Sequence, residues 1–153
     1  MKRGFFSLWE FLSETDYKAH GVSGWQFVCP VLLGAMNRLR EELDRPITGN
    51  TWKYGGNLNW RGVRTVGYNK YSITSAHAWG RALDFDVSDL TPIEVVRYII
   101  LNRERYPEIK FIEIDITWVH IDTMQREQDT DELVLWSPSR GYVDVDLFLK
   151  ETS

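Results

Sequence analysis

Cysteine is nearly absent from this sequence, which has only Cys29 among 153 residues. One cysteine cannot form an internal disulfide, and it supplies too little sulfur for a Cys-based zinc site. Long basic runs are absent too, and the net charge is −4, so nucleic acid is not an expected partner. No segment has the apolar length of a membrane span. Any bound metal must therefore be held by histidine and carboxylate side chains.

A signal peptide is also lacking. The first nine residues imitate one briefly, but Glu10, Glu14 and Asp16 interrupt the apolar stretch and no small-residue cleavage site follows. We expect residues 5–12 to form a short amphipathic helix instead. If the target of the protein lies outside the inner membrane of a bacterium, another component must deliver it there.

The chain does have enough apolar residues for a real core, since 43% of its residues are hydrophobic and it carries seven Trp, seven Tyr and seven Phe. The sequence contains no internal repeat and no long linker, so we expect a single domain. Pro30 and the helical spacing of the apolar residues after it predict a helix over residues 30–43, which Pro46 stops. Thr91 and Glu94 form a capping-box pattern that predicts a second helix, to about residue 104.

Strand patterns lie around these helices. Residues 81–87 alternate apolar and polar side chains, residues 110–122 are rich in Ile and Val and predict two strands or a hairpin, and residues 133–136 predict another strand. Residues 143–149 fit a strand or a helix. Residues 47–75 look irregular, and a loop of that length in a small domain is usually functional. Helices and strands interleave without a repeating βαβ unit, so α+β is the predicted fold class.

Two of the three histidines lie in suggestive surroundings, and with one carboxylate they could form a metal site. Catalytic zinc typically takes three His and carboxylate ligands and leaves a fourth position for water, which then loses its proton near neutrality. His77, Asp84 and His120 have this chemistry. Each also has a structural explanation: a capped turn for His77, a solvated strand position for Asp84, and a satisfied histidine between strands for His120. Spacing alone favours those structural explanations.

The pattern Ser-x-His-x-x-Gly-x-Ala-x-Asp at 75–84, followed by Trp-x-His-x-Asp at 118–122, resembles the D-alanyl-D-alanine carboxypeptidase-like zinc peptidases, in a superfamily that includes the hedgehog signalling domain. Residues 50–56, 60–65 and 111–113 extend the resemblance to a phage-associated type of that family. The resemblance implies a small, mainly antiparallel sheet with helices packed on one side. It also implies that His77, Asp84 and His120 are the ligands of one zinc ion.

The same resemblance implies roles for residues around the ligands. Arg64 matches an arginine that binds a carboxylate of the substrate peptide, as a guanidinium fork can, although a surface salt bridge is the alternative and Arg61 is a nearby competitor. Ser75 matches a position that hydrogen-bonds near the site, and a turn-forming serine would look the same. Gly80 and Ala82 match small positions where the backbone packs close to the metal-binding strands.

The general base is open between two residues. Family members carry a Glu or Asp shortly before the second histidine, and this chain offers Glu113 and Asp115. In one unbroken strand both would face away from His120, so a turn or bulge must reset the register. The match to the family favours Glu113, with Asp115 as the alternative. Asp122 shares a strand face with His120 and fits a partner of that ligand, while Trp118 fits a packed wall of the site.

Other residues with reactive or aromatic side chains have no partner motif. His20 and Cys29 are interpreted as structural or surface residues. Five aromatic residues in the irregular segment fit either a groove for a peptide-glycan chain or the packing of a long loop; they are Trp52, Tyr54, Trp60, Tyr68 and Tyr71. The acidic residues 127–132 fit a solvated loop.

The resulting hypothesis is a zinc peptidase that hydrolyses an amide bond in peptidoglycan stem peptides, as an endolysin or a carboxypeptidase would. One alternative is a catalytically inactive module that zinc stabilises, such as a virion component; another is a cytoplasmic peptidase for free D-amino-acid dipeptides. We expect a monomer with no membrane span. Without a signal peptide, a phage enzyme would stay in the host cytoplasm until lysis or be carried by the virion.

Overall fold

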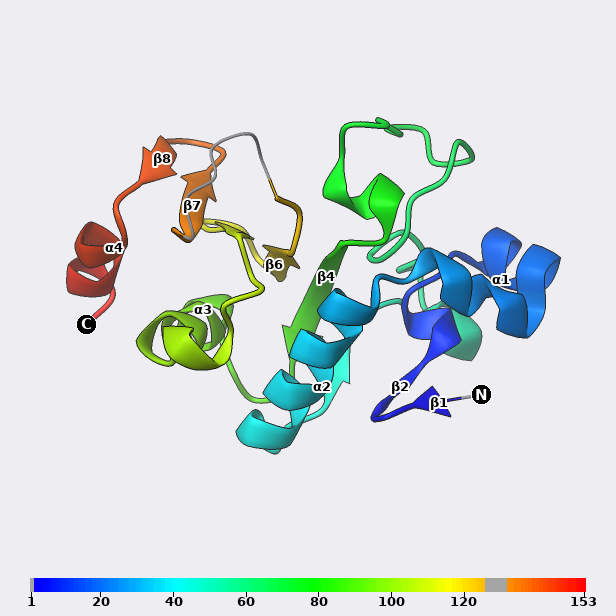
Figure 1. Ribbon diagram of the computed structural model, residues 1–153, viewed down its shortest axis with the longest axis horizontal. Helices are drawn as coiled ribbons and strands as arrows, with labels where there is room; N and C mark the ends of the chain where they lie inside the picture. Colours follow the sequence, from blue (N-terminus) through cyan, green and yellow to red (C-terminus); the bar gives the residue numbers. More distant parts are fainter. Residues whose placement is uncertain (1, 126–131) are drawn as a thin grey trace.

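A sheet forms the centre of the protein (Figure 1). It has six strands, in the order β3-β4-β6-β5-β7-β8. The computed structural model describes residues 2–125 and 132–153. The strands of this sheet are β3 (Ile47–Thr48), β4 (Ala82–Val87), β5 (Phe111–Glu113), β6 (Val119–Asp122), β7 (Val134–Ser137) and β8 (Gly141–Val143). β5 and β7 pair in parallel and all other neighbours pair antiparallel. The predicted α+β class with a mainly antiparallel sheet is confirmed.

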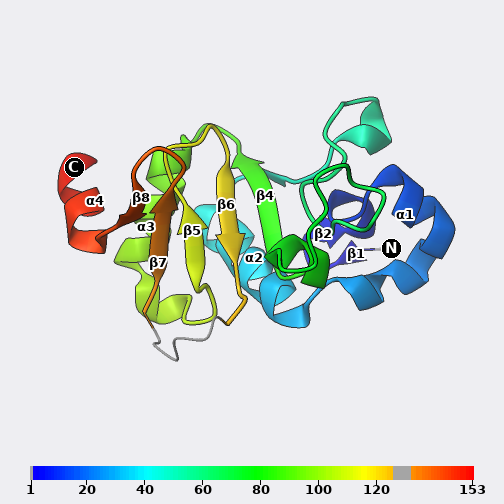
Figure 2. The ribbon, with the colours of Figure 1, turned by 90° about the horizontal axis from the view of Figure 1, so that it is seen from above.

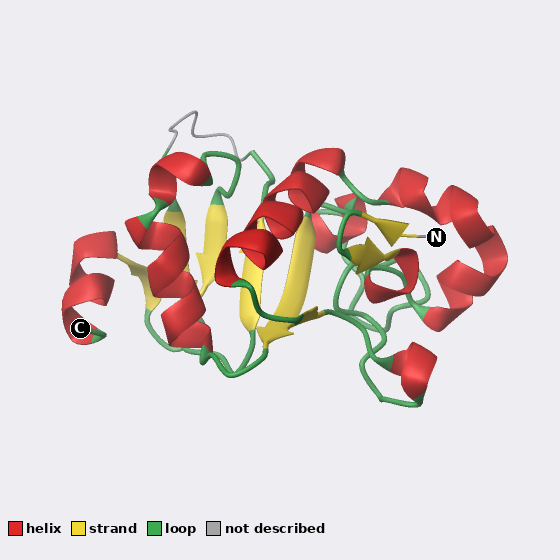
Figure 3. Cartoon of the chain, turned by 90° about the horizontal axis from the view of Figure 1, so that it is seen from below, coloured by secondary structure: helices red, strands yellow, loops and turns green. Residues whose placement is uncertain are grey.

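Two helices cover one face of this sheet, α2 (Pro30–Leu43) and α3 (Pro92–Leu101). Figures 2 and 3 view the sheet from opposite sides: the strands lie in front in Figure 2, and α2 and α3 lie in front in Figure 3. Helices α1 (Glu14–His20) and α4 (Val145–Glu151) lie toward the two ends of the molecule. None of the helices in the described residues is long and apolar enough to cross a membrane.

Alternation along the strands separates two sets of side chains. The set on the covered face is apolar and almost fully buried in the core: Leu83, Phe85, Ile112, Val119, Ile121 and Leu135. Residues between them point to the opposite face, because successive strand side chains alternate. The helices therefore cover one face of the sheet and leave the other free for a site.

The helix predicted over residues 5–12 is wrong. The structure has short strands β1 (Lys2–Arg3) and β2 (Phe6–Ser7), followed by a 3-10 turn, η1 (Leu8–Glu10). The Glu10 carboxylate accepts a hydrogen bond from the Ser7 backbone N–H (2.7 Å), which closes the turn early. Ser13 then starts α1, which the sequence reading missed, by accepting a hydrogen bond from the Asp16 backbone N–H (3.1 Å).

The other helix predictions hold with small differences. α2 begins at Pro30 and ends at Leu43, as predicted. The Thr91–Glu94 capping box is present, and α3 ends at Leu101, where a separate 3-10 turn, η5 (Arg103–Arg105), replaces its predicted last turn. The segment that fitted a strand or a helix contains both: β8 ends at Val143, and Asp144 then caps α4 by accepting from the Leu147 N–H (2.9 Å).

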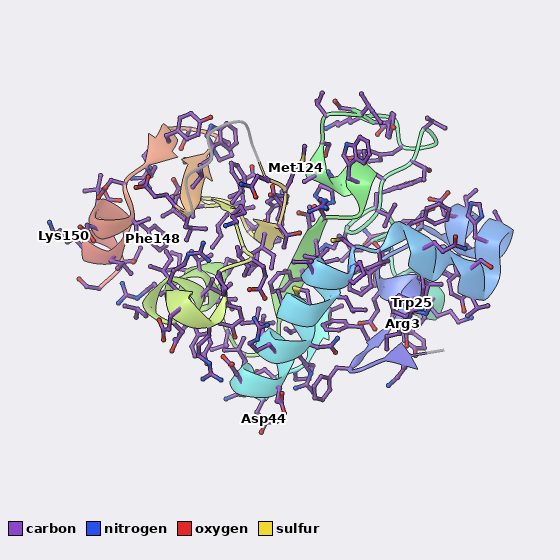
Figure 4. All side chains as sticks on the ribbon, viewed as in Figure 1. Arg3, Trp25, Asp44, Met124, Phe148 and Lys150 are labelled. Carbon is purple, nitrogen blue, oxygen red and sulfur yellow. The ribbon has the colours of Figure 1, made fainter. Side chains whose placement is uncertain are left out.

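The long irregular segment divides into two parts with different surroundings. Its first part, with the 3-10 turn η3 (Trp52–Tyr54), packs on the N-terminal region: the Trp52 indole donates to the Leu12 carbonyl (2.9 Å) and lies 5.4 Å from the Tyr17 ring. The N-terminal region is also held by Arg3, whose guanidinium lies 5.0 Å from the centre of the Trp25 ring (Figure 4). The second part leads through η4 (Ala76–Trp79) into β4, at the open face.

Candidate metal centre

Three potential ligands from separate elements meet at one point. His77 comes from η4, Asp84 from β4 and His120 from β6, and their ligand atoms lie within 4.8 Å of one another. All three side chains are buried, at 3%, 6% and 7% exposure. The antiparallel register of β4 and β6 pairs Asp84 directly with His120. The sheet therefore sets two of the ligands side by side, and the turn before β4 supplies the third.

The His77 ring is held in one orientation. Its Nδ1 lies 2.7 Å from the Gly62 carbonyl oxygen, which can only accept, so Nδ1 carries the proton. The neutral ring then presents an unprotonated Nε2, and this atom lies 3.4 Å from Asp84 Oδ1. Fixing the tautomer of a metal-binding histidine through its other nitrogen is a common feature of metal sites.

His120 is oriented from the opposite direction. Its Nδ1 lies 2.7 Å from Asp84 Oδ1, whereas its Nε2 lies 3.7 Å from Asp122 Oδ2. The Phe111 ring meets the imidazole edge-to-face, 5.9 Å away. Asp122 is 1% exposed and lies behind the ring, where the sequence placed it as a partner of the ligand. Nδ1 of His120 therefore faces the same point as Nε2 of His77.

The carboxylate between the rings changes the protonation of the whole cluster. Burial tends to raise the pKa of Asp84, but hydrogen bonds with His120 and His77 outweigh it and hold that pKa far below its usual range. Burial lowers the pKa of His77. For His120 burial also acts downward, yet its contacts with Asp122 and Asp84 raise the pKa to about 9. A metal ion at this point would displace that proton, since a ligating imidazole must be unprotonated.

Arg64 contacts the remaining oxygen of the central carboxylate. Its Nη2 lies 2.5 Å from Asp84 Oδ2, and its Nε donates to the Trp60 carbonyl (2.8 Å). The guanidinium also lies 5.0 Å from the centre of the Tyr68 ring, and Tyr68 packs against Trp60 at 5.5 Å. Arg64 thus directs Oδ2 away from the ligand point and leaves Oδ1 facing it. Of the predicted aromatic set, Trp60 and Tyr68 lie beside the site.

Two glycines allow the chain to approach this closely. A Cβ at Gly62 would lie 2.3 Å from the Phe11 carbonyl oxygen, and Gly62 is the residue that orients His77. Gly80 has φ +62°, and a Cβ there would lie 1.7 Å from the Phe27 carbonyl oxygen. No other residue fits at either position without moving the backbone. Gly80 does permit a close approach, but to Phe27 and Val28 and not to the metal-binding strands, where the sequence predicts it.

Glu113 and Asp115, the two candidates for the general base, have different environments. β5 ends at Glu113, and the turn after it resets the register so that Glu113 pairs directly with His120. Directly paired residues lie on the same face of the sheet. Asp115 lies in the turn with φ +61°, and its carboxylate accepts a hydrogen bond from Arg140 Nε (2.9 Å). Of the two, only Glu113 lies in the row of the metal ligands.

The pKa values of Glu113 and Asp115 are shifted in opposite directions. Burial raises the pKa of Glu113, and no residue in the described parts of the chain donates a hydrogen bond to its carboxylate. Hydrogen bonds from Ser137 and Arg140 lower the pKa of Asp115. Glu113 is therefore the better proton acceptor near neutrality and Asp115 is a charged partner of Arg140.

Two further sequence candidates have structural roles here. The Ser75 hydroxyl accepts from the His77 backbone N–H (3.3 Å) and caps η4, so the turn-forming explanation of Ser75 describes its contact. Arg61 Nη1 pairs with Asp86 Oδ2 (2.5 Å), whereas Arg64 pairs with Asp84, so of the two arginines Arg64 is the one whose side chain contacts the ligand cluster. The Arg61 backbone carbonyl still accepts from the Asp84 N–H (2.8 Å), which ties the loop to β4.

Sequence reasoning assigned no role to Asn50, which anchors this loop. Asn50 is fully buried; its Nδ2 donates to the Leu12 carbonyl (2.8 Å) and its Oδ1 accepts from the Arg61 N–H (2.9 Å). A buried amide with both ends bonded to distant backbone fixes the path of the chain between them. Its position inside the family-like segment 50–56 was the only signal in the sequence.

Comparison of the chain with models of protein families, with curated proteins and with solved structures gave no match. The donor set itself defines what the site can hold. Two imidazole nitrogens and one carboxylate oxygen suit a first-row divalent metal such as zinc, and three protein ligands leave a position for another group. The buried His77–Asp84–His120 cluster can therefore hold one metal ion.

Proposed function

We propose that this protein is a zinc-dependent peptidase that hydrolyses an amide bond in peptidoglycan stem peptides, with the hedgehog/DD-peptidase type of fold. The observation that carries the proposal is the row Asp84–His120–Glu113 across three neighbouring strands. This row places a carboxylate that accepts no hydrogen bond from any described residue beside a two-histidine, one-aspartate cluster. Zinc bound there would polarise a carbonyl and make a water molecule more acidic, which is the chemistry that amide hydrolysis needs.

The residues of the chain have distinct roles in this proposal. Glu113 takes a proton from the attacking water and passes it to the leaving amine, and its raised pKa suits both steps. Arg64 Nη1 makes no hydrogen bond within the described residues, so it can bind a substrate carboxylate while Nη2 holds Asp84. Asp122 and the Gly62 carbonyl hold the two imidazole rings in place.

The cellular setting is part of the same proposal. A phage enzyme of this kind would accumulate in the host cytoplasm until lysis, or would be carried by the virion. If the protein is instead an inactive module that zinc stabilises, Glu113 has no role as a base, because a purely structural metal site needs none.

The test is the metal content of the purified native protein beside two variants, His120→Ala and His20→Ala. His20 is an exposed histidine outside the cluster, so it controls for general metal binding. We expect about one zinc per chain in the native protein and in His20→Ala, and none in His120→Ala. Zinc-dependent release of amino groups from purified peptidoglycan then tests the activity. A native chain that binds no zinc at neutral pH would overturn the proposal.

A further inference from the structure

Two aromatic residues continue the row of the metal centre across the sheet. Glu113 pairs with His120 on one side and with Trp136 of β7 on the other, and Trp136 pairs with Tyr142 of β8. Paired residues share a face, so Asp84, His120, Glu113, Trp136 and Tyr142 form one line on the open face. β6, β5, β7 and β8 lie side by side in this order (Figure 2).

Within the described residues, the two rings have no ring-stacking or hydrogen-bonding partner. Tyr142 is 81% exposed and Trp136 is half-buried. Within the described residues neither ring stacks on another ring, and neither the Trp136 indole N–H nor the Tyr142 hydroxyl makes a hydrogen bond. As far as the described residues go, the Tyr142 ring, the exposed part of the Trp136 ring and both polar groups are thus accessible to a ligand.

Among the described residues, the charges near the rings are mostly paired or capped. Of the strand residues that share this face on β5 and β7 only Glu113 is charged; beside Tyr142, Arg140 pairs with Asp115 and Glu151, and Asp144 caps α4. A flat, neutral aromatic surface does not select a charged group. It suits a ring with an apolar C–H face and hydroxyls at its rim, because the aromatic face is electron-rich and attracts the slightly positive C–H hydrogens.

Distance along the row fits a short peptide between the ring and the metal. Neighbouring strands are about 4.8 Å apart, so Tyr142 lies roughly 14 Å from His120. An extended peptide covers about 3.5 Å per residue, so roughly four residues span that distance. A stem peptide of a few residues joined to a sugar would therefore place its scissile bond at the metal when the sugar lies on Tyr142.

We propose that Trp136 and Tyr142 form a binding surface for a pyranose ring, which holds the glycan part of a peptidoglycan substrate beside the metal centre. The inference rests on the proposed function for the identity of the substrate. The stem peptide has small and charged side chains, so the sugar rings are the flat faces that peptidoglycan offers to these aromatics. The simpler explanation, that this cross-strand pair only stabilises the β7–β8 hairpin, predicts no sugar binding.

The first test uses a tetramer of N-acetylglucosamine, which has no peptide and therefore reports on binding alone. Its dissociation constant is measured by calorimetry for the native chain, Tyr142→Ala, Trp136→Leu and the control Phe5→Ala. Phe5 is 48% exposed but lies in the N-terminal region, with the Arg40 guanidinium 5.3 Å from the centre of its ring. We expect at least about tenfold weaker binding in each of the first two variants and none of that loss in the control.

Tyr142→Ala decides the outcome if Trp136→Leu fails to fold, since an exposed ring contributes little to folding. A native chain that does not bind the tetramer at millimolar concentration, or a Tyr142→Ala variant that binds as the native chain does, overturns the inference.

A second test separates this inference from the proposed function. Hydrolysis is compared on a sugar-free stem peptide and on the same peptide linked to a disaccharide. We expect Tyr142→Ala to lower hydrolysis of the linked substrate at least about fivefold relative to the free peptide. An equal loss on both substrates overturns the inference. Sugar binding without hydrolysis of either substrate by the zinc-loaded native chain rejects the peptidase and supports the sugar surface.

Discussion

The two faces of the central sheet are built from the same strands and differ in almost every property. On β6, Ile121 points into the apolar core while its neighbour His120 points to the metal centre; on β4, Leu83 and Asp84 divide in the same way. The covered face contains aliphatic and aromatic side chains packed under α2 and α3. The open face contains the three candidate ligands and, within the described residues, a carboxylate without a hydrogen-bond donor and two aromatic rings without a stacking partner.

This difference shows how a small domain separates stability from chemistry. Because side chains alternate with period two, one half of the strand residues can stabilise the core while the other half forms the candidate site. The same rule makes the register strict, since a slip of one residue would exchange the two faces. Substitutions on one face should therefore leave the other intact.

The largest effect is expected on the open face, from Glu113→Gln. The amide keeps the shape of the side chain but cannot accept the proton, so kcat should fall about 10²- to 10⁴-fold. Zinc content and the free energy of unfolding should stay at native values. Steady-state hydrolysis of a stem peptide, with metal analysis of the same samples, checks this.

Asp115→Asn is the rival variant, because Asp115 was the other candidate for the base. It should leave kcat within about threefold of native, since Asp115 lies in the turn and pairs with Arg140. A large loss in Asp115→Asn with little loss in Glu113→Gln would exchange the two assignments. Losses in neither variant would support the inactive module.

On the covered face, Ile121→Ala tests the opposite side of the comparison. Ile121 is fully buried, so its truncation should reduce the free energy of unfolding by about 2–5 kcal/mol. Ile93→Ala on α3 is the matched control: Ile93 is 50% exposed and should cost less than about 0.5 kcal/mol. Urea denaturation measures both. The folded Ile121→Ala protein should still bind one zinc, and loss of zinc from that folded protein would show that the faces are coupled.

Arg64→Ala should have an intermediate effect and should act on the metal. The guanidinium holds the Asp84 carboxylate with Oδ1 toward the ligand point, and without it the carboxylate loses that orientation, so zinc affinity should fall about 10- to 100-fold. Arg61→Ala removes a similar charge that pairs with Asp86 and should leave the affinity unchanged. Competition with a zinc-binding dye measures both. A higher KM with native zinc affinity would instead assign Arg64 to substrate binding alone.

The sequence predicts features that depend on local signals. α2 and α3 begin at their proline and capping residues because those signals act within one turn. α1 was missed because the apolar run before it suggested an earlier helix, although Ser13 and Asp16 form a cap pattern. The ligand set came from a recognisable motif, and the structure brings its three members together.

The sequence does not predict the contacts between residues that are far apart along the chain. The pairing of Glu113 with His120 depends on the turn in which Asp115 has a left-handed backbone conformation. Aspartate tolerates this conformation, but its presence in the sequence does not predict it. Arg64 contacts Asp84, and Asn50 donates to the Leu12 carbonyl. Each contact joins segments that come together only in the folded chain. The line from His120 to Tyr142 likewise needs the parallel pairing of β5 with β7.

The smallest effect concerns the rim between the two faces, where Arg140 joins Asp115 to Glu151 of α4. Hydrogen bonds from Ser137 and Arg140 lower the pKa of Asp115 in the folded chain, so the charged carboxylate stabilises the fold. That contribution is fully present above the unfolded value, near about 4, and is lost as the pH falls through the lower folded value. Asp115→Asn should therefore be slightly less stable than the native chain at pH 7, and the difference should vanish at strongly acidic pH. Thermal unfolding of both proteins from pH 7 to about pH 2 measures it. A difference that stayed constant over this range would show that Asp115 acts through the shape of the turn, and that the rim, like the core, is held by packing.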